Sequence, residues 1–130
     1  MIVIDASAMV EALVGRNADD KLLDALQTSL HAPHLLDVEV LSVLRGLTLG
    51  GKLAPDAAEQ ARTDYFALTI ARYELSGLAD RVWGLRHSYT AYDASCLALA
   101  EALDVPLYTC DRKLASDAHG AKILVLARTR

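Results

Sequence analysis

The sequence predicts an α/β protein: a three-layer α/β/α sandwich with a mostly parallel central sheet. Short runs of branched apolar residues alternate along the chain with longer segments whose apolar residues recur at helical spacing. Strands joined by helices imply right-handed crossovers, which place helices on both faces of a parallel sheet. The 130 residues have the size of one ordinary domain and contain no repeat or linker, so we expect a single domain over 1–130.

The N-terminal part of the chain is predicted to contain one strand and two helices. Residues 2–4, Ile-Val-Ile, favour a buried strand, and the helix after it covers 7–14 and ends near Gly15. Asn17 is a candidate N-cap for a second helix. That helix carries four leucines on one face: Leu22, Leu23, Leu26 and Leu30. Residues 31–33 are predicted to form a short extended link.

Four further elements are predicted in the middle of the chain. A third helix covers about 35–49, where apolar residues recur at helical spacing. A fourth helix covers 55–66 and begins with a proline, which suits a first turn. Residues 68–75 alternate between apolar and polar side chains and so predict a strand. A fifth helix is predicted over about 78–87.

The last part of the chain is predicted to hold one long helix, one short helix and two strands. Residues 90–103 are rich in Leu and Ala and favour a helix. Residues 105–109 predict a strand, which a short helix containing Lys113 and Leu114 follows. The final strand covers 123–126, Ile-Leu-Val-Leu.

Two aspartates lie at the ends of predicted strands. Asp5 comes straight after the first strand, and Asp111 follows a later strand with only Cys110 between them. Ligands of parallel sheets bind beyond the carboxyl ends of the strands, so we expect both side chains on the same rim. An aspartate at the start of a helix is also a common N-cap. This alternative stays open for Asp5, Asp111 and Asp93.

Glu39 is harder to explain as a purely structural residue. It lies between Val38 and Val40 in an otherwise apolar helix, at or beside the predicted buried stripe. A carboxylate in that position is costly unless it is paired or bound to a metal. The alternative is that Glu39 lies at the margin of the stripe, in solvent.

The candidate site is therefore a cluster of four carboxylates: Asp5, Glu39, Asp93 and Asp111. All-oxygen ligation with retained waters is the preference of Mg²⁺, for which Mn²⁺ can substitute. Zinc is disfavoured because no His or Cys shares the pattern. Such ions lower the pKa of a bound water and orient a phosphodiester. The hydroxyls of Ser7 and Thr109 could hold a metal-bound water or a carboxylate, or could act as local caps.

The composition limits the cellular setting. A net charge of −4 argues mildly against a nucleic-acid partner, but four metal-bound carboxylates would leave a nearly neutral surface with local basic patches. No apolar run approaches the roughly 20 residues of a membrane span, and the first residues are not a signal peptide. Cys96 and Cys110 have no metal-ligand spacing and are expected to be buried, reduced thiols. We expect a cytoplasmic protein with no membrane partner.

Four short motifs occur in order along nearly the whole chain: Ile4-Asp5-Ala6-Ser7, Glu39-Val40-Leu41, Thr90-Ala91-Tyr92-Asp93-Ala94, and Leu107-Tyr108-Thr109-Cys110-Asp111 with Leu114. Each motif is weak alone, but their order, spacing and context together are specific. In this arrangement the sequence resembles PIN-domain ribonucleases, and most closely the VapC toxins of bacterial toxin–antitoxin pairs.

The resemblance implies a compact PIN-like fold and Mg²⁺-dependent endonucleolytic cleavage of single-stranded or looped RNA, leaving a 5′-phosphate and a 3′-hydroxyl. It also implies homodimers and a cognate antitoxin that places a basic side chain in the acidic pocket. The family's acidic residues carry over onto Asp5, Glu39, Asp93 and Asp111, and its supporting polar residues onto Ser7 and Thr109. The middle region, about 50–74, matches no motif and is expected to shape the dimer or the substrate groove.

Basic and aromatic residues near the motifs are candidates for RNA contacts. The basic ones are Arg112, Lys113, Arg86, Arg16 and Arg45, each of which could equally be solvated surface charge. Tyr89 and Tyr92 flank the third motif and could stack on a base, although we expect Tyr92 to pack in the core. Asp117 has no motif position and is expected on a solvated helix face.

Two other classes of function remain alternatives. The first is an aspartate-dependent phosphatase or phosphotransferase, but such sites usually need a second acid where this sequence has Ser7. The second is a non-catalytic α/β binding module, because fold alone does not establish activity. A glycine-rich dinucleotide-binding loop is absent after the first strand.

Overall fold

A five-stranded parallel sheet forms the centre of the molecule. The structure is a computed structural model that describes all of residues 1–130. The strands lie in the order β3-β2-β1-β4-β5, and every neighbouring pair is parallel. Their bounds are β1 (Ile2–Ile4), β2 (Leu30–Pro33), β3 (Ile70–Tyr73), β4 (Leu107–Thr109) and β5 (Ile123–Val125).

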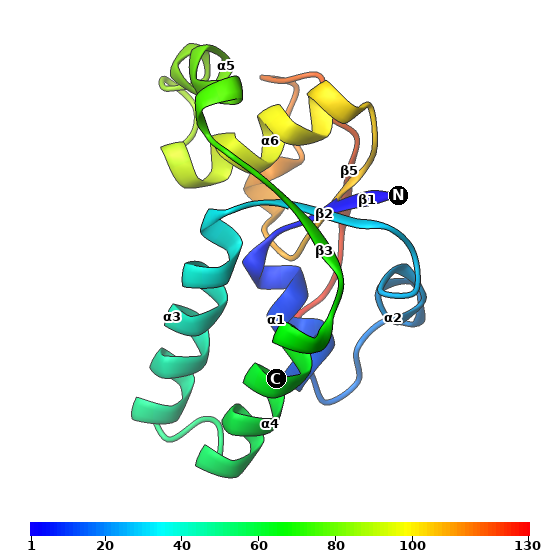
Figure 1. Ribbon diagram of the computed structural model, residues 1–130, viewed down its shortest axis with the longest axis vertical. Coiled ribbons are helices and arrows are strands. Elements are labelled where there is room, and N and C mark those ends of the chain that lie inside the picture. Colours follow the sequence, from blue (N-terminus) through cyan, green and yellow to red (C-terminus); the bar gives the residue numbers. More distant parts are fainter.

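Helices cover both faces of this sheet, as the alternation of apolar runs predicts (Figure 1). In Figure 1, α5 and α6 lie above the strands, whereas α1, α3 and α4 lie below them. The helices are α1 (Ala6–Val14), α2 (Asp20–Ala25), α3 (Leu35–Leu49), α4 (Pro55–Ala67), α5 (Ala79–Gly84) and α6 (Ala91–Leu103), with 3₁₀ turns η1 (Ser76–Leu78) and η2 (Arg112–Leu114). The predicted three-layer α/β/α sandwich is confirmed.

The central strand β1 divides its side chains between two hydrophobic cores. Ile2 and Ile4 pack into the larger core with residues of α1, α3 and α4, whereas Val3 packs into the smaller core with residues of α5 and α6. Successive side chains of a strand point to opposite faces, so a strand covered on both sides reads as a continuous apolar run. This burial fixes the end of β1, and with it the position of the residue that follows.

The second helix is shorter than predicted. It covers Asp20–Ala25 and is capped by Asp19, whose side chain accepts a hydrogen bond from the backbone N–H of Lys21 at 2.8 Å. The prediction of Asn17 as its N-cap is wrong. The prediction that Leu30 belongs to this helix is also wrong, because turns end the helix before the next strand begins.

The segment predicted as an extended link is the strand β2. It pairs with β1 on one side and β3 on the other, and all four of its residues are buried. His31 is accommodated there because its ring bonds the hydroxyls of Ser29 and Tyr73, both at 2.7 Å. Pro33 stands at the last position of the strand, where β2 pairs with β3 but no longer with β1. The sequence prediction missed this strand because His31 and Pro33 interrupt its apolar pattern, whereas pairing with β1 and β3 stabilises it.

The remaining boundaries differ from the predictions by a few residues. The strand predicted over 68–75 is β3, at an edge of the sheet. The helix predicted over 78–87 is the short α5, preceded by η1, and the chain continues after Gly84 in hydrogen-bonded turns. The strand predicted over 105–109 begins at Leu107, after Pro106.

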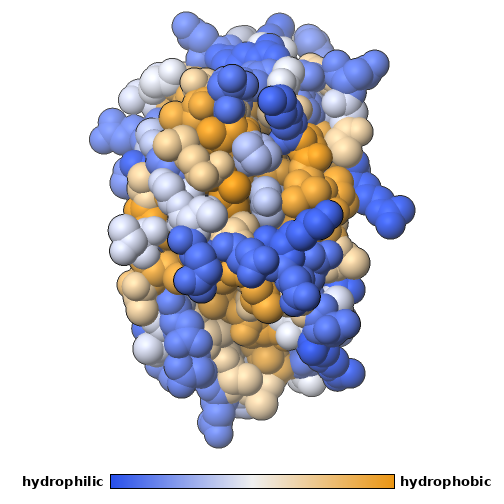
Figure 2. Space-filling view, turned by 90° about the vertical axis from the view of Figure 1, so that its right-hand side faces the viewer, coloured by the Kyte–Doolittle hydropathy of each residue, from blue (hydrophilic) through white to orange (hydrophobic).

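Hydrophobic and hydrophilic residues alternate over the surface. On the face drawn in Figure 2, a band of hydrophilic side chains crosses the middle of the molecule between two areas of more apolar surface. None of the helices combines the length and the apolar character that a membrane crossing requires.

Candidate active site

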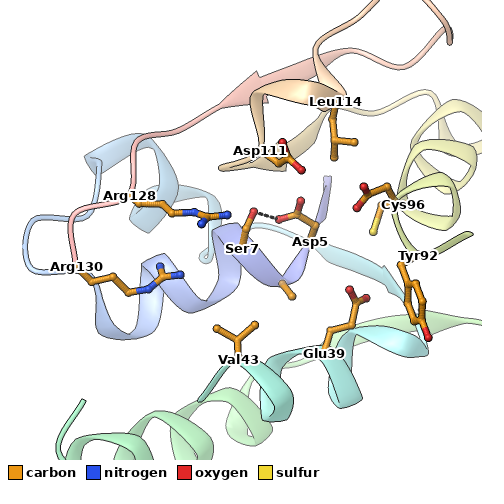
Figure 3. A pocket seen from close by; sticks show the side chains of 12 residues that line it. Asp5, Ser7, Glu39, Val43, Tyr92, Cys96, Asp111, Leu114, Arg128 and Arg130 are labelled. Carbon is orange, nitrogen blue, oxygen red and sulfur yellow. Dashed lines mark hydrogen bonds between the residues drawn. The ribbon is translucent and has the colours of Figure 1, made fainter. Parts of the chain in front are cut away.

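The carboxyl ends of β1 and β4 place two acids at the same edge of the sheet, because these strands are parallel neighbours. Asp5 follows β1 directly, and Asp111 lies two residues beyond β4. Glu39 from the second turn of α3 and Asp93 from the first turn of α6 complete the group. All four carboxylates line one cavity of about 260 Å³, the acidic cavity (Figure 3). The structure thus brings together four acids that are far apart in the sequence.

The carboxylate of Asp5 is held by hydrogen bonds to both of its oxygens. Ser7 Oγ donates to Oδ1 at 2.7 Å, and the backbone N–H of Ala8 donates to the same oxygen at 3.0 Å. Thr109 Oγ1 donates to Oδ2. Asp5 is therefore the N-cap of α1 and a cavity residue at once, because a carboxylate has enough lone pairs for both roles.

Ser7 and Thr109 each accept a backbone N–H while they donate to Asp5. The N–H of Cys110 donates to Ser7 Oγ at 2.8 Å, and the N–H of Asp111 donates to Thr109 Oγ1 at 3.0 Å. Because backbone donors occupy lone pairs of these hydroxyls, the single proton of each is directed at the Asp5 carboxylate. The two supporting polar residues thus connect α1 to the end of β4.

Of the other two aspartates, Asp111 caps a helix and Asp93 does not. Asp111 accepts the N–H of Lys113 at 3.0 Å and caps η2, yet its side chain still lines the acidic cavity. Asp93 is not a cap: the side chain of Thr90 accepts the N–H of Asp93 and caps α6. The carboxylate of Asp93 is consequently available to the cavity.

Burial and mutual repulsion raise the pKa values of three of these acids. For Asp5, burial is the largest cause, and it outweighs the hydrogen bonds that stabilise the ionised form. Burial and the charges of Asp5 and Asp93 raise the pKa of Glu39. Burial and the charges of Asp111 and Asp5 raise the pKa of Asp93, while Lys113 opposes the change. The cavity is therefore a place where positive charge is favoured.

Apolar and aromatic side chains complete the wall of the cavity. Val43, Cys96 and Leu114 line it between the acids (Figure 3). Cys96 is buried, as expected, and burial raises the pKa of its thiol well above the ordinary value. Tyr92 also lines the cavity but is 58% exposed, so the expectation that it packs in the core is wrong. The first turn of α6 turns this ring outward beside Asp93.

Two arginines at the end of the chain also line the acidic cavity, and the sequence prediction missed both. Arg128 and Arg130 lie beyond β5, and Figure 3 shows their guanidinium groups directed toward the cavity. The signal that could have found them is the rule applied to Asp5 and Asp111. Because β5 is parallel to β4, the residues after it reach the same rim of the sheet.

The PIN domain family model matches residues 2–119. Ribonuclease VapC1 of Mycobacterium tuberculosis is 43% identical over 117 residues, which cover 88% of this chain and 88% of that protein. The chain belongs to the VapC ribonucleases of the PIN-domain family. Among solved structures, PAE2754 from Pyrobaculum aerophilum superposes with a TM-score of 0.72 at 22% identity, covering 94% of this chain and 81% of that one. A toxin–antitoxin complex from Klebsiella pneumoniae gives 0.57 at 19% identity, with 90% and 92% covered. The PIN-like fold is therefore confirmed.

In this VapC chain, the other predicted RNA contacts lie outside the acidic cavity. Arg112 and Lys113 are exposed on η2, next to Asp111. Arg86 is exposed and stacks on Trp83, 4.8 Å from the ring centroid. Tyr89 is half-buried, and its hydroxyl bonds Ser116. Asp117 is exposed and lines none of the cavity, as expected, but it lies in a bend after η2 and not on a helix, so that part of the expectation is wrong.

Proposed function

We propose that this chain is a Mg²⁺-dependent endoribonuclease, a hydrolase that cleaves phosphodiester bonds in single-stranded or looped RNA. The observation that carries the proposal is the convergence of Asp5, Glu39, Asp93 and Asp111 on one cavity. The ribonuclease names of its VapC relatives supply the substrate class. Structural caps alone would not explain Glu39 and Asp93, because neither side chain caps a helix.

The residues present fit a hard divalent cation. The cavity offers four carboxylates and no histidine, which is the donor set that Mg²⁺ or Mn²⁺ prefers over zinc. No three acidic, histidine or cysteine side chains are close enough together to hold an ion directly. Mg²⁺ is commonly held by one or two carboxylates and keeps several waters, so this wider spacing suits it. Of Asp5, Asp93, Asp111 and Glu39, one or two would hold the ion directly, and the others would hold its bound waters.

When bound, the cation would supply positive charge for the phosphodiester and lower the pKa of an attacking water. The protein supplies position. Ser7 and Thr109 fix the Asp5 carboxylate so that its orientation does not change as substrate enters. Glu39 reaches across from α3, opposite the strand ends, and completes the acidic wall from the other side. No protein nucleophile is needed.

We further infer that a cognate antitoxin neutralises the enzyme by placing a basic side chain in the acidic cavity. Like-charge repulsion among the carboxylates makes an incoming cation favourable there. A solved structure of the same fold is a toxin–antitoxin complex, which supports a partner of this kind. We also propose that the active form is a homodimer.

The direct test is cleavage of structured RNA by the purified protein with Mg²⁺, with Mn²⁺ and with EDTA. We expect cleavage with either ion, none in EDTA, and a loss of at least about 100-fold in Asp5→Asn and Asp93→Asn. Asp117→Asn is the matched control, because it removes the same charge from an exposed position outside the cavity. Cleavage that persists in EDTA, or in both cavity variants, would refute the proposal.

A phosphate monoester assayed in parallel distinguishes the phosphatase alternative. The nuclease proposal predicts no turnover of that compound under conditions in which RNA is cleaved. Turnover of the monoester without RNA cleavage would favour the alternative.

A further inference from the structure

A second cavity, of about 320 Å³, lies beside the acidic one and is lined by basic side chains. We call it the basic pocket; its charged residues are Arg16, Lys52, Arg128 and Arg130, and its apolar ones are Val14, Leu47 and Leu53. No acidic side chain lines it. Four cations around one cavity in a chain whose net charge is −4 form a local concentration of positive charge.

The basic pocket adjoins the acidic cavity. Arg128 and Arg130 line both, so the two cavities share one wall. In Figure 3 the two guanidinium groups extend from the C-terminal segment toward Ser7 and Val43, at the edge of the acidic cavity. A ligand that fills the acidic cavity and extends along the surface in this direction therefore meets the basic pocket next.

The segment that carries these arginines is fixed to the body of the protein. Leu126 is buried, and its N–H donates to the carbonyl of Thr109 at 2.8 Å. Further along, Thr129 Oγ1 accepts the N–H of Asn17 at 3.0 Å, and its carbonyl accepts the N–H of Arg16 at 3.3 Å. The arginines thus stand on an anchored segment, which we call the C-terminal arm (residues 126–130).

Glu11 is the main anchor of this arm. Its carboxylate is fully buried at 0% exposure, and it accepts hydrogen bonds from the N–H of Thr129 at 2.9 Å and from the Thr129 hydroxyl. Arg130 adds an ion pair at 3.5 Å. A buried carboxylate is costly without such partners, and here the C-terminal arm supplies them. Gly15 makes room for Glu11, because a Cβ at position 15 would lie 2.2 Å from Glu11 Oε2.

We propose that the basic pocket binds a backbone phosphate of the RNA strand that enters the acidic cavity, and that Glu11 positions the C-terminal arm for this contact. The proposal rests on the proposed ribonuclease function. An RNA strand that leaves the acidic cavity carries one negative charge per nucleotide, which the shared arginines and then Arg16 and Lys52 would meet. Arginine suits this task because its planar fork bonds two phosphate oxygens at once.

An RNA strand fits the two cavities better than an acidic peptide does. RNA needs both signs of protein charge side by side: carboxylates that hold the cation at the cleaved bond, and cations for the flanking phosphates. An acidic peptide would be attracted by the basic pocket but repelled by the carboxylates that share its wall.

The test measures binding without cleavage. A short fluorescein-labelled oligouridylate is titrated in EDTA, with fluorescence anisotropy as the readout. We expect the double variant Arg16→Ala/Lys52→Ala to bind about 10-fold more weakly near 0.1 M salt, and its slope of log K against log salt to be less steep by about 1.4. The control is Lys21→Ala/Lys122→Ala, which removes the same charge from exposed residues that line neither cavity and should bind normally.

The role of Glu11 is tested through its partner on the arm. Thr129→Val removes the hydroxyl that bonds Glu11 and Asn17, whereas Thr129→Ser keeps it. We expect Thr129→Val to weaken RNA binding about 3-fold or more, roughly the net contribution of one ordinary hydrogen bond, and to raise KM with kcat nearly unchanged. Thr129→Ser should have the RNA affinity and the KM of the wild type. A purely structural role would lower the amount of folded enzyme, and hence apparent kcat, without a change in KM.

The outcomes separate this proposal from the proposed function. Wild-type cleavage with unchanged binding by Arg16→Ala/Lys52→Ala would overturn the basic pocket and leave the nuclease intact. Weakened binding by that variant without any wild-type cleavage would support the pocket and refute the nuclease. If the variant binds oligouridylate normally but loses affinity for polyglutamate, the pocket is a peptide site and the RNA proposal fails.

Discussion

The carboxylate of Asp5 accepts three hydrogen bonds at the start of α1 and still lies in a cavity with three other acids. One carboxylate can therefore cap a helix and line a functional cavity, since Oδ1 of Asp5 accepts the capping N–H while the carboxylate faces the cavity. Asp111 repeats the arrangement at η2. At such positions a helix start supplies rigidity, which keeps a functional carboxylate in one orientation.

The repulsion within the acidic cavity predicts that the charge of Asp93 lowers the stability of the metal-free protein. Burial and the charges of Asp111 and Asp5 disfavour its ionised form. We expect Asp93→Asn to raise the midpoint of thermal unfolding in EDTA by about 2 °C, a small effect because Asp93 is partly exposed and its charge partly screened. Differential scanning fluorimetry measures it.

Added Mg²⁺ should make the unfolding midpoint of the wild type higher than that of Asp93→Asn, because an ion bound to the folded state stabilises the wild type more than the variant. Asp117→Asn serves as the control and should match the wild type under both conditions. If Asp93→Asn were less stable than the wild type in EDTA, repulsion would not be the dominant effect at this position.

Sequence reasoning placed the acids correctly where a strand end or an apolar helix made them unusual. Asp5 and Asp111 follow from the strand-end rule, and Glu39 from its position beside a buried stripe. Tyr92 and the arginines of the C-terminal arm were not found. The direction in which the first turn of α6 presents Tyr92 depends on the packing of α6 against the sheet, and a local pattern does not contain that information.

At the scale of elements, one side-chain cluster connects three of them. Asp37 on α3 accepts a hydrogen bond from the hydroxyl of Tyr65 on α4 at 2.6 Å and pairs with Arg72 on β3 at 3.0 Å. Burial, followed by the bond to Asp37, raises the pKa of Tyr65. The cluster holds α4 against α3 and thereby supports the helix that carries Glu39.

This cluster predicts a loss of stability in Tyr65→Phe. The substitution removes a fully buried hydroxyl that donates to a carboxylate, so the free energy of unfolding should fall by about 1–2 kcal/mol in urea denaturation. Tyr92→Phe is the matched control, because the Tyr92 hydroxyl is exposed and should leave stability unchanged. An equal effect in both variants would show that the bond to Asp37 contributes nothing.

Elements with a strong local pattern were predicted well, whereas β2 was not. The strand β1 and the helix α3 can be predicted from their own residues, because the first is an apolar run and the second is amphipathic. The strand β2 contains a histidine and a proline, and its extended conformation depends on pairing with two strands far away in the sequence. Its polar side chains are satisfied only by residues that the fold brings to it, such as Tyr73.

At the scale of the whole molecule, the four acids of the acidic cavity and the four cations of the basic pocket line two adjoining cavities that share Arg128 and Arg130. The expected local basic patch exists, and it lies directly beside the carboxylates. The overall charge of −4 therefore describes neither region. Figure 2 shows that hydropathy is also unevenly distributed, with a hydrophilic band between more apolar areas.

The proposed homodimer has a candidate surface in the groove between α3 and α4. Leu41 and Leu49 are 40% and 70% exposed there and line this groove. We expect light scattering to give twice the mass of one chain, and Leu41→Glu to shift the protein toward monomer, because a charge in an apolar interface is costly. Leu23→Glu is the matched control, since Leu23 is also 40% exposed but lies on α2. A dimer that Leu41→Glu leaves intact would exclude the groove.

The position of β1 in the middle of the sheet has a consequence for synthesis. This strand is made first, yet one of its neighbours, β4, lies more than 100 residues later. Until a ribosome has released the chain past Asp111, Asp5 lacks its Thr109 partner and the four acids have no common wall. Assembly of the cavity is thus postponed until the segment that carries Asp111 has been made. A nascent chain that ends before Asp111 therefore lacks the complete acidic cavity.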